Sequence, residues 1–333
     1  MTGWIKFLFL RLLRLALVLA AVAIVAFSLA KLSPVDPINA YLGLDIARVG
    51  PEQRALIAAK WGLDQPAMVQ LGRWAANLLS GDLGRSSTFN APVSEVILSR
   101  VQASLPLVGL AWLLSGLLGF ALGVLAGAFP GTWLDRVIRV YSYILASTPT
   151  FWLAILLLIV FSVGLRWTPI CCAGPIGVLP QDVTLLERLH HLVLPLVVLT
   201  VLGIAQIALH TRAKMIEIMR SDYALYARAQ GASRLDVAFR HGARNAALPA
   251  ITVLFASLGE LFGGSILAEQ VFAYPGLGRA AVEAGIRGDV PLLLAVALCL
   301  TLFVSVGNTI ADILYHVVDP RMSWRSGPAE GLA

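Results

Sequence analysis

Long apolar runs separated by polar segments dominate the chain. A helix needs about 20 mostly apolar residues to cross a hydrocarbon core of about 30 Å. Six runs approach or exceed this length, and they cover 7–30, 103–129, 140–165, 192–210, 248–272 and 291–317. The pattern therefore predicts an all-α membrane protein with six transmembrane helices.

Proline and glycine refine these predicted spans. Pro149 removes a backbone donor inside the third run and predicts a kink there. The second run carries Gly119, Gly123 and Gly127 at four-residue spacing, which favours close helix packing over a substrate path. Ser28-Leu29-Ala30 is compatible with signal-peptide cleavage, but the run before it is long for that and favours a retained helix.

Composition supports the membrane assignment and excludes most enzyme classes. The 333 residues are 58% hydrophobic and 13% charged, and the net charge of +6 comes from basic residues beside apolar runs, which indicates orientation and not nucleic-acid binding. No lysine follows a glycine, so there is no phosphate-binding loop, and neither HExxH nor GxSxG occurs. We expect no catalytic residues, no metal site and no cofactor in this chain.

The polar segment between the fourth and fifth runs has its own pattern. Residues 211–246 hold seven Lys and Arg against three acids, which predicts a cytoplasmic location. A short helix is predicted over 223–229 and stopped by Gly231, and a second over 234–243 with Ser233 as N-cap. Such a helix pair suits docking into a groove on a soluble partner; the alternative is a solvated basic loop that only sets topology.

This segment also carries a resemblance. YARAQGAS followed by RHGARNAALP resembles the cytoplasmic coupling loop of ABC-importer permeases, in the peptide and nickel group. ExVFxYPGLGR from Glu269 and DPR at 319–321 are similar to other signatures of that group. The general loop pattern has an acid six residues before the glycine, where this chain has Leu225. The charge contact to the ATPase is therefore left to residues such as Asp222 or Arg228.

The resemblance implies a type I ABC importer permease fold with cytoplasmic coupling helices. It also implies a second homologous permease in a heterodimer, two cytoplasmic ATPase subunits that bind the ATP, and an extracytoplasmic solute-binding protein. The protein would be a multi-pass component of the bacterial inner membrane with both termini cytoplasmic. The expected ATPase-coupling residues are Asp222, Tyr226, Ala227, Arg228, Ala229, Gly231 and Ala232.

The expected organisation has four parts. Residues 1–31 form an N-terminal segment with the first helix, and 32–102 form an extracytoplasmic segment of zero net charge that resembles the part of the family facing the binding protein. Residues 103–320 form a five-helix core that includes the coupling loop at 211–247. Residues 321–333 form a small polar cytoplasmic tail.

Substrate contacts are expected around a carboxylate inside the fifth run. An acid at that depth is costly unless it faces the bundle interior or a pathway, although a helix–helix hydrogen bond would also explain it. The candidate pathway or gate residues are Glu260, Gly263, Gly264, Glu269, Pro275 and Gly276. Short peptides or nickel and metal chelates are the expected cargo. An ion-coupled transporter using Glu260 or Asp312, and a membrane scaffold, are alternatives from other classes.

The three cysteines are an odd number and give no even disulfide framework or metal-ligand spacing. Cys299 lies in an apolar run and is expected to pack there. The adjacent Cys171 and Cys172 are interpreted as incidental residues of an outer loop, with a soft-metal trap as the alternative. His190 and His191 are neighbours whose side chains should point apart, which disfavours a shared metal.

Overall fold

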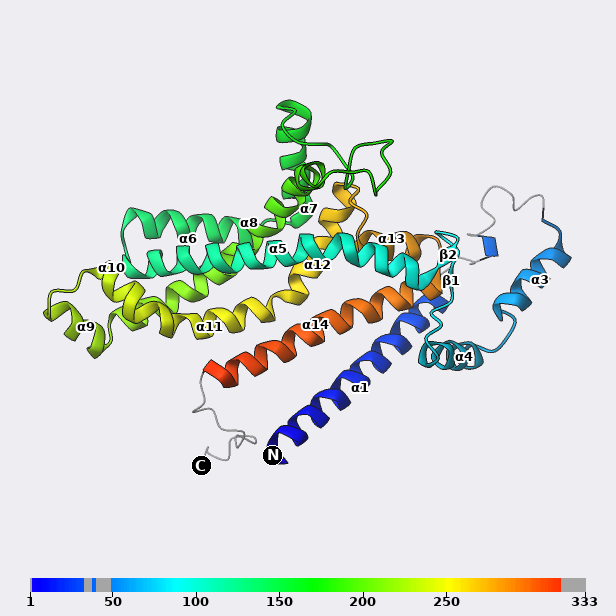
Figure 1. The fold of residues 1–333 in the computed structure, drawn as a ribbon, viewed down its shortest axis with the longest axis horizontal. Helices are drawn as coiled ribbons and strands as arrows, with labels where there is room; N and C mark the ends of the chain where they lie inside the picture. Colours follow the sequence, from blue (N-terminus) through cyan, green and yellow to red (C-terminus); the bar gives the residue numbers. More distant parts are fainter. Residues whose placement is uncertain (1, 33–37, 40–48, 319–333) are drawn as a thin grey trace. The chain divides into compact units, whose positions relative to one another are not determined.

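The structure, a computed structural model, describes residues 2–32, 38–39 and 49–318, and these are almost entirely helical (Figure 1). The DPR at 319–321 and the tail at 321–333 lie outside the described residues. The chain divides into two compact units. One contains Leu105–Tyr274 and the chain from Val304 on, and the other contains Thr2–Ser104 and Pro275–Phe303.

The predicted membrane-spanning helices are present. Four helices are long and apolar enough alone, with spans at Phe9–Leu29, Val93–Ala128, Leu185–Met219 and Val290–Ile313. Two further spans arise when bent helix pairs are each counted once, Trp133–Ala146 with Thr150–Gly164 and Arg234–Ala256 with Leu258–Val271. This confirms the all-α membrane fold, with two of six spans broken.

The unit that contains Thr2–Ser104 combines helices with a small hairpin. Its elements are α1 (Thr2–Leu32), α3 (Pro51–Trp61), α4 (Ala67–Leu79), β1 (Arg85–Ser86) antiparallel to β2 (Ala91–Pro92), α13 (Leu277–Ile286), and the first parts of α5 (Val93–Ala128) and α14 (Val290–Val318). Buried Asp289 accepts hydrogen bonds from Ser86 Oγ (2.5 Å) and the Thr88 amide (2.9 Å). This carboxylate joins the hairpin to the start of α14.

The other unit carries the predicted coupling segment. Besides the rest of α5 and α14, it contains α6 (Trp133–Ala146), α7 (Thr150–Leu157) with the π-helical η2 (Leu158–Gly164), α8 (Leu185–Met219), α9 (Asp222–Ala229), α10 (Arg234–Asp236) with the π-helical η3 (Val237–Gly242), α11 (Ala243–Ala256) and α12 (Leu258–Val271). In Figure 1, α9 and α10 lie at the end of α8 remote from α7.

Four of the predicted starts were wrong. The helix of the fifth run begins at Arg234 and not at 248, and local chemistry explains the other three. The second span begins at Val93 and not at 103, because Val93 and Val96 are buried in the core and the helix continues over them. The fourth begins at Leu185 and not at 192, because Thr184 and Glu187 form a reciprocal capping box. The third begins at Trp133 and not at 140, with Thr132 as its N-cap.

Pro149 has a larger effect than the predicted kink. The helix ends at Ala146 and α7 starts at Thr150, with Pro149 as its N-cap residue. The two segments are bent by 106°. Proline offers no amide to continue the previous helix but is well accepted before a new one, so the chain turns sharply here.

The glycine stripe of α5 packs against α8, as predicted. A Cβ atom added at Gly119, Gly123 or Gly127 would lie 2.5–2.8 Å from a Cβ atom of α8. The α8 residues concerned, Ile207, Thr211 and Met215, repeat at the same four-residue spacing. The helices are therefore in close contact along matched rows, as small residues permit.

Candidate functional site

The predicted helix–glycine–helix segment folds with well-defined helix ends. Gly231 has φ +94°, the left-handed region in which glycine is favoured. Its amide donates to Arg228 O (3.0 Å), and the Ala232 amide donates to Ala227 O (3.1 Å). This pair of bonds is a Schellman motif, which satisfies the carbonyls at the end of α9. The predicted stop at Gly231 is confirmed.

The second predicted helix starts as expected but does not end there. Ser233 Oγ accepts from the Asp236 amide (3.1 Å), so the predicted N-cap is confirmed. The prediction of an end at Ala243 was wrong, since the helix runs from Arg234 to Ala256 through the π-helical η3. Neither Gly242 nor Pro249 interrupts it, and Gly242 instead fits closely against the Met215 side chain of α8.

One face of this segment is anchored in the unit. Ala224 of α9 and Val237 and Ala238 of η3 are fully buried. They join a core cluster with Val124 of α5 and Met215 of α8. The Asn245 side-chain amide also donates to Tyr223 Oη (3.1 Å), which ties α9 to α11. The segment is therefore a packed part of the unit and not a loose loop.

The opposite face is exposed and mixes apolar and charged groups. Tyr226 is 66% exposed and Phe239 51%. We call this face the coupling surface and define it by Asp222, Leu225, Tyr226, Arg228, Leu235 and Phe239. Of the predicted coupling residues, Asp222, Tyr226, Arg228, Ala229 and Gly231 are exposed, whereas Ala227 and Ala232 are half-buried and pack on the core cluster.

A buried ion pair lies between α6 and α8. Asp135, with no exposed surface, accepts from Arg212 Nε (2.5 Å) and Nη2 (2.9 Å), and also from the Gly131 amide (2.9 Å). Such a bidentate pair between arginine and carboxylate is strong and directional. This pair was not predicted from the sequence, because the partners are 77 positions apart and no local pattern links them.

The carboxylate of Glu260 borders a cavity at the second helix break. Helices α11 and α12 are bent by 47°, and Glu260 lies in the first turn of α12. Beside it is a cavity of about 200 Å³. We call it the polar cavity, because its lining includes the polar residues Ser115, Thr148, Thr150, Gln206, Ser257 and Glu260.

Gln206 of α8 and Glu260 of α12 both line this cavity and are joined by a hydrogen bond. Gln206 Nε2 donates to Glu260 Oε2 over 2.9 Å, and both side chains are exposed. Among the lining residues that the structure describes, Glu260 alone carries a charge. Gln206 was missed in our sequence analysis, although an amide inside a predicted span was a signal of a polar interior.

The structure brings only some of the predicted pathway residues together. Gly264 lines the polar cavity with Glu260, whereas Gly263 is not among its lining residues. Glu269 is fully buried towards the other end of α12. Pro275 and Gly276 precede α13 in the other unit.

Tyr274 follows α12 and is buried. Its amide donates to Glu269 O (2.8 Å). Burial, helped by the Glu269 carboxylate, raises the pKa of Tyr274 to about 12. Its hydroxyl therefore stays neutral at physiological pH.

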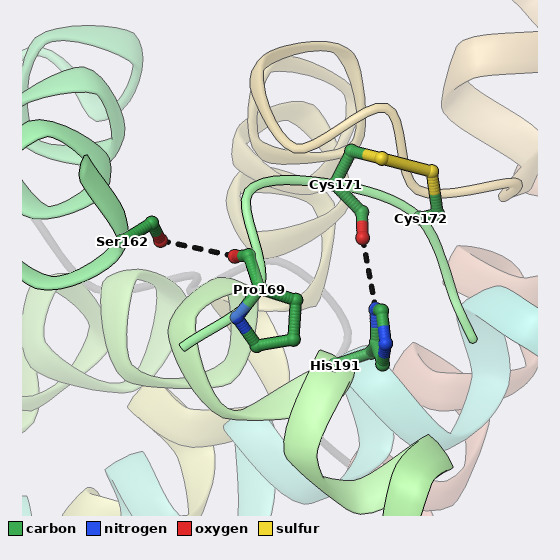
Figure 2. The surroundings of a disulfide bond; sticks show 5 residues. All are labelled: Ser162, Pro169, Cys171, Cys172 and His191. Atoms are coloured by element: carbon green, nitrogen blue, oxygen red, sulfur yellow. Dashed lines mark hydrogen bonds between the residues drawn. A yellow bond between two sulfur atoms is a disulfide. The ribbon is translucent and has the colours of Figure 1, made fainter. Parts of the chain in front are cut away.

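The two adjacent cysteines form a disulfide, which corrects the expectation that they are incidental residues without a framework. They lie in the loop between η2 and α8, whose backbone is tied to both neighbours. Ser162 Oγ of η2 donates to Pro169 O (2.9 Å), and His191 Nδ1 of α8 donates to Cys171 O (2.8 Å), as Figure 2 shows. His190 instead bonds Trp167 O (2.9 Å), so the two histidines hold separate carbonyls.

Comparison with known proteins gives consistent matches over most of the chain. Residues 119–324 match the family described as "Binding-protein-dependent transport system inner membrane component". Residues 4–106 match the N-terminal model of membrane components of the same kind of system.

Individual relatives are similar over nearly their full length. The chain is 35% identical to the oligopeptide transport system permease protein AppB of Bacillus subtilis (strain 168), over 92% of this chain and 96% of that protein. It is 39% identical to a putative peptide transport system permease protein of Brucella abortus (strain 2308), over 92% and 95%. It is 33% identical to the di/tripeptide transport system permease protein DppB of Pseudomonas aeruginosa, over 90% and 94%.

Proposed function

The chain belongs to the binding-protein-dependent transport system inner membrane component family, and we propose that it carries short peptides as one of two homologous permease subunits. As a permease subunit of an ABC importer it is not an enzyme, and ATP is hydrolysed by separate subunits. The family membership confirms the resemblance drawn from the coupling segment. It also sets aside the ion-coupled and scaffold alternatives.

The polar cavity is the observation that supports a peptide substrate. A peptide in water carries an α-ammonium group with three donors, and the polar cavity offers it the Glu260 carboxylate and several neutral acceptors. A carboxylate facing a primary ammonium group forms a charge-assisted hydrogen bond. The relatives reported above are all named for peptides, oligopeptides or di/tripeptides.

Nickel is less well supported as cargo. Borderline metal ions favour several nitrogen, sulfur or carboxylate ligands. Within the part of the chain that the structure describes, no group of three or more His, Cys, Asp or Glu residues is placed to hold a metal ion. A single carboxylate beside an amide suits a monovalent cationic group better.

The coupling surface is where the ATPase subunits would act. Because α9 and η3 are packed on α5 and α8, a displacement of the coupling surface carries the attached helices with it. Helix α8 leads into this segment and α10–α12 lead out of it, and these two runs supply Gln206 and Glu260. Closure of the ATPases on ATP would thus move both walls of the polar cavity, as alternating access requires.

Charge and the disulfide support the proposed orientation. The basic coupling segment is assigned to the cytoplasm. Disulfides persist in oxidising compartments, so the loop with Cys171 and Cys172 is assigned to the outer side. With six spans, both termini are then cytoplasmic. The described residues 49–92 and 275–289 would then face outward, where a solute-binding protein would dock.

Glu260→Gln tests the substrate assignment in the complete importer, reconstituted with its partner subunits and binding protein. Uptake of a dipeptide with a free N-terminus should fall about tenfold, the usual effect of losing a charged hydrogen bond. Uptake of the N-acetylated dipeptide should be slow in both proteins and unchanged by the substitution. If the wild type takes up no peptide, the peptide assignment is wrong. Equal losses for both peptides would show that Glu260 does not recognise the ammonium group, but would leave the peptide assignment standing.

Gly231→Val tests the coupling surface separately. A β-branched residue at φ +94° is strained by about 1–2 kcal/mol, and the Schellman motif would be disrupted. We expect normal membrane insertion but loss of peptide-stimulated ATP hydrolysis. Gly109→Val is the matched control, since a Cβ atom added at Gly109 meets no atom within 4 Å. Full coupling in Gly231→Val would contradict the docking role.

A further inference from the structure

The Cys171–Cys172 disulfide closes a small ring through the peptide bond that joins the two residues. Their Cα atoms are 3.7 Å apart, close to the normal spacing across a trans peptide. Both residues are only half-buried, so part of each is open to solvent. The disulfide therefore constrains the local backbone, not the distance between remote parts of the chain.

This short ring holds a backbone bridge between two helices. The Cys172 amide donates to Phe272 O over 2.9 Å, and Phe272 is the residue that ends α12. The Cys171 carbonyl accepts from His191 on α8 at 2.8 Å. In Figure 2 this carbonyl points at the His191 ring while the disulfide lies on the far side of the chain. The ring thus connects the start of α8 to the end of α12.

The backbone of Cys172 shows what the ring maintains. Its φ is +78°, a value that residues other than glycine rarely adopt. In an open chain a cysteine would return readily to negative φ, and its amide would then turn away from Phe272 O. The bridge from the loop to α12 is therefore expected to depend on the closed ring.

We propose that Cys171–Cys172 is a thiol–disulfide exchange site, open to a dithiol, whose oxidised form ties α8 to α12. A thiolate of the dithiol attacks one of the two sulfur atoms and forms a mixed disulfide, releasing the other cysteine as a thiol. The second thiol of the reagent then displaces the remaining cysteine. The protein gains two electrons and two protons, and the reagent leaves as its cyclic disulfide.

The site is connected to the polar cavity through α12. Glu260 is at the start of this helix and Phe272 at its end, roughly 18 Å away at the rise of an α-helix. Gln206, the partner of Glu260, is on α8, the other helix that the bridge holds. Reduction should release the end of α12 and disturb the alignment of Gln206 with Glu260. Transport should then slow.

Thiol labelling tests the redox state without relying on transport. In membranes containing the full importer, a maleimide should leave Cys171 and Cys172 unmodified until dithiothreitol is added, after which both should react. Peptide mass spectrometry separates this pair from Cys299, which is a free thiol. Modification of both residues without reductant would overturn the proposal, as would failure of dithiothreitol to expose them.

Hydrogen exchange then tests the bridge. Reduction should speed exchange of the Cys172 amide and of the amides that follow α12, while the amides of α9, at the other end of α8, should be unchanged. Equal exchange in the oxidised and reduced protein would overturn the link to α12.

Uptake measurements test the functional consequence. Dithiothreitol should slow uptake about fivefold or more, the factor that corresponds to one left-handed residue. In the matched control Cys299→Ser, dithiothreitol should slow uptake by the same factor as in the wild type. Cys171→Ser/Cys172→Ser should show the slow rate with or without reductant. Cys171→Ser/Cys172→Gly, in which glycine accepts positive φ, should be faster than the double serine variant and insensitive to reductant. Reductant sensitivity in either double variant would overturn the proposal.

Discussion

Helix α8 has a closed side and an open side. On the closed side, α5 lies so near that a methyl group at Gly123 would be 2.5 Å from Thr211 Cβ, and the ion pair of Asp135 with Arg212 ties α6 to the same helix. On the open side, α12 and α8 border the polar cavity, and a methyl group at Gly264 would be 3.5 Å from its nearest neighbour. Glycine therefore permits close helix packing at Gly123, whereas at Gly264 it leaves the polar cavity open.

The difference indicates which interface moves. Close packing along matched rows resists sliding, because every residue would have to pass its neighbour. A cavity lined by polar groups can change its shape without losing a packed interface. We therefore expect α5, α6 and α8 to act as one body, and α12 to be the element that rearranges beside it during transport. Three substitutions test this contrast.

Asp135→Asn should have the largest effect. It leaves the largely buried Arg212 without its counter-charge, and loss of one partner of a buried pair costs about 3 kcal/mol. The purified importer should unfold at a clearly lower temperature in a thermal melt. The double variant Asp135→Asn/Arg212→Gln removes both charges and should recover much of the loss. Equal melting of the single and double variants would contradict the pairing argument.

Gly123→Ala should have an intermediate effect on the same closed side. The added methyl group would lie 2.7 Å from the Ala208 carbonyl oxygen as well as close to Thr211, so α5 and α8 must separate. Overpacking of this kind costs about 1–3 kcal/mol. Gly109→Ala, on the same helix but with open space around its Cβ, is the matched control for the melt. A normal melting temperature for Gly123→Ala would show that the closed side is looser than the contacts indicate.

Gly264→Ala should have the smallest effect on stability. Its methyl group would make ordinary contacts with Thr150 and Leu199, so the melting temperature should not fall. The added group does narrow the polar cavity, so uptake of bulky dipeptides should drop more than uptake of diglycine. A loss of stability like that of Gly123→Ala would erase the distinction between the two sides.

Features set by neighbouring residues were predictable from the sequence. Apolar run length gave the spans, and the stop at Gly231 and the cap at Ser233 follow from the chemistry of a few adjacent positions. The cap at Thr184 obeys the same rules and could have been read, because Glu187 stands three residues later.

Features that depend on the folded arrangement were not predictable. Gly242 and Pro249 look like helix breakers, yet Gly242 packs against Met215 at the end of η3, and Pro249 lies inside the continuous α11. No local pattern pairs Asp135 with Arg212, or Gln206 with Glu260. The disulfide between Cys171 and Cys172 was missed because the number and spacing of cysteines do not show whether two adjacent cysteines are bonded.

The uninterrupted helix from Arg234 to Ala256 gives the molecule a long lever arm. At 1.5 Å per residue it is roughly 35 Å long, so a tilt of about 3° at the end that carries the coupling surface would shift the far end by ~2 Å. A displacement of this size is enough to break a hydrogen bond. Ser257 connects this helix to α12, so the displacement would also move Glu260. If Glu260 binds the peptide as proposed, a small movement of the coupling surface is enough to form or break that contact.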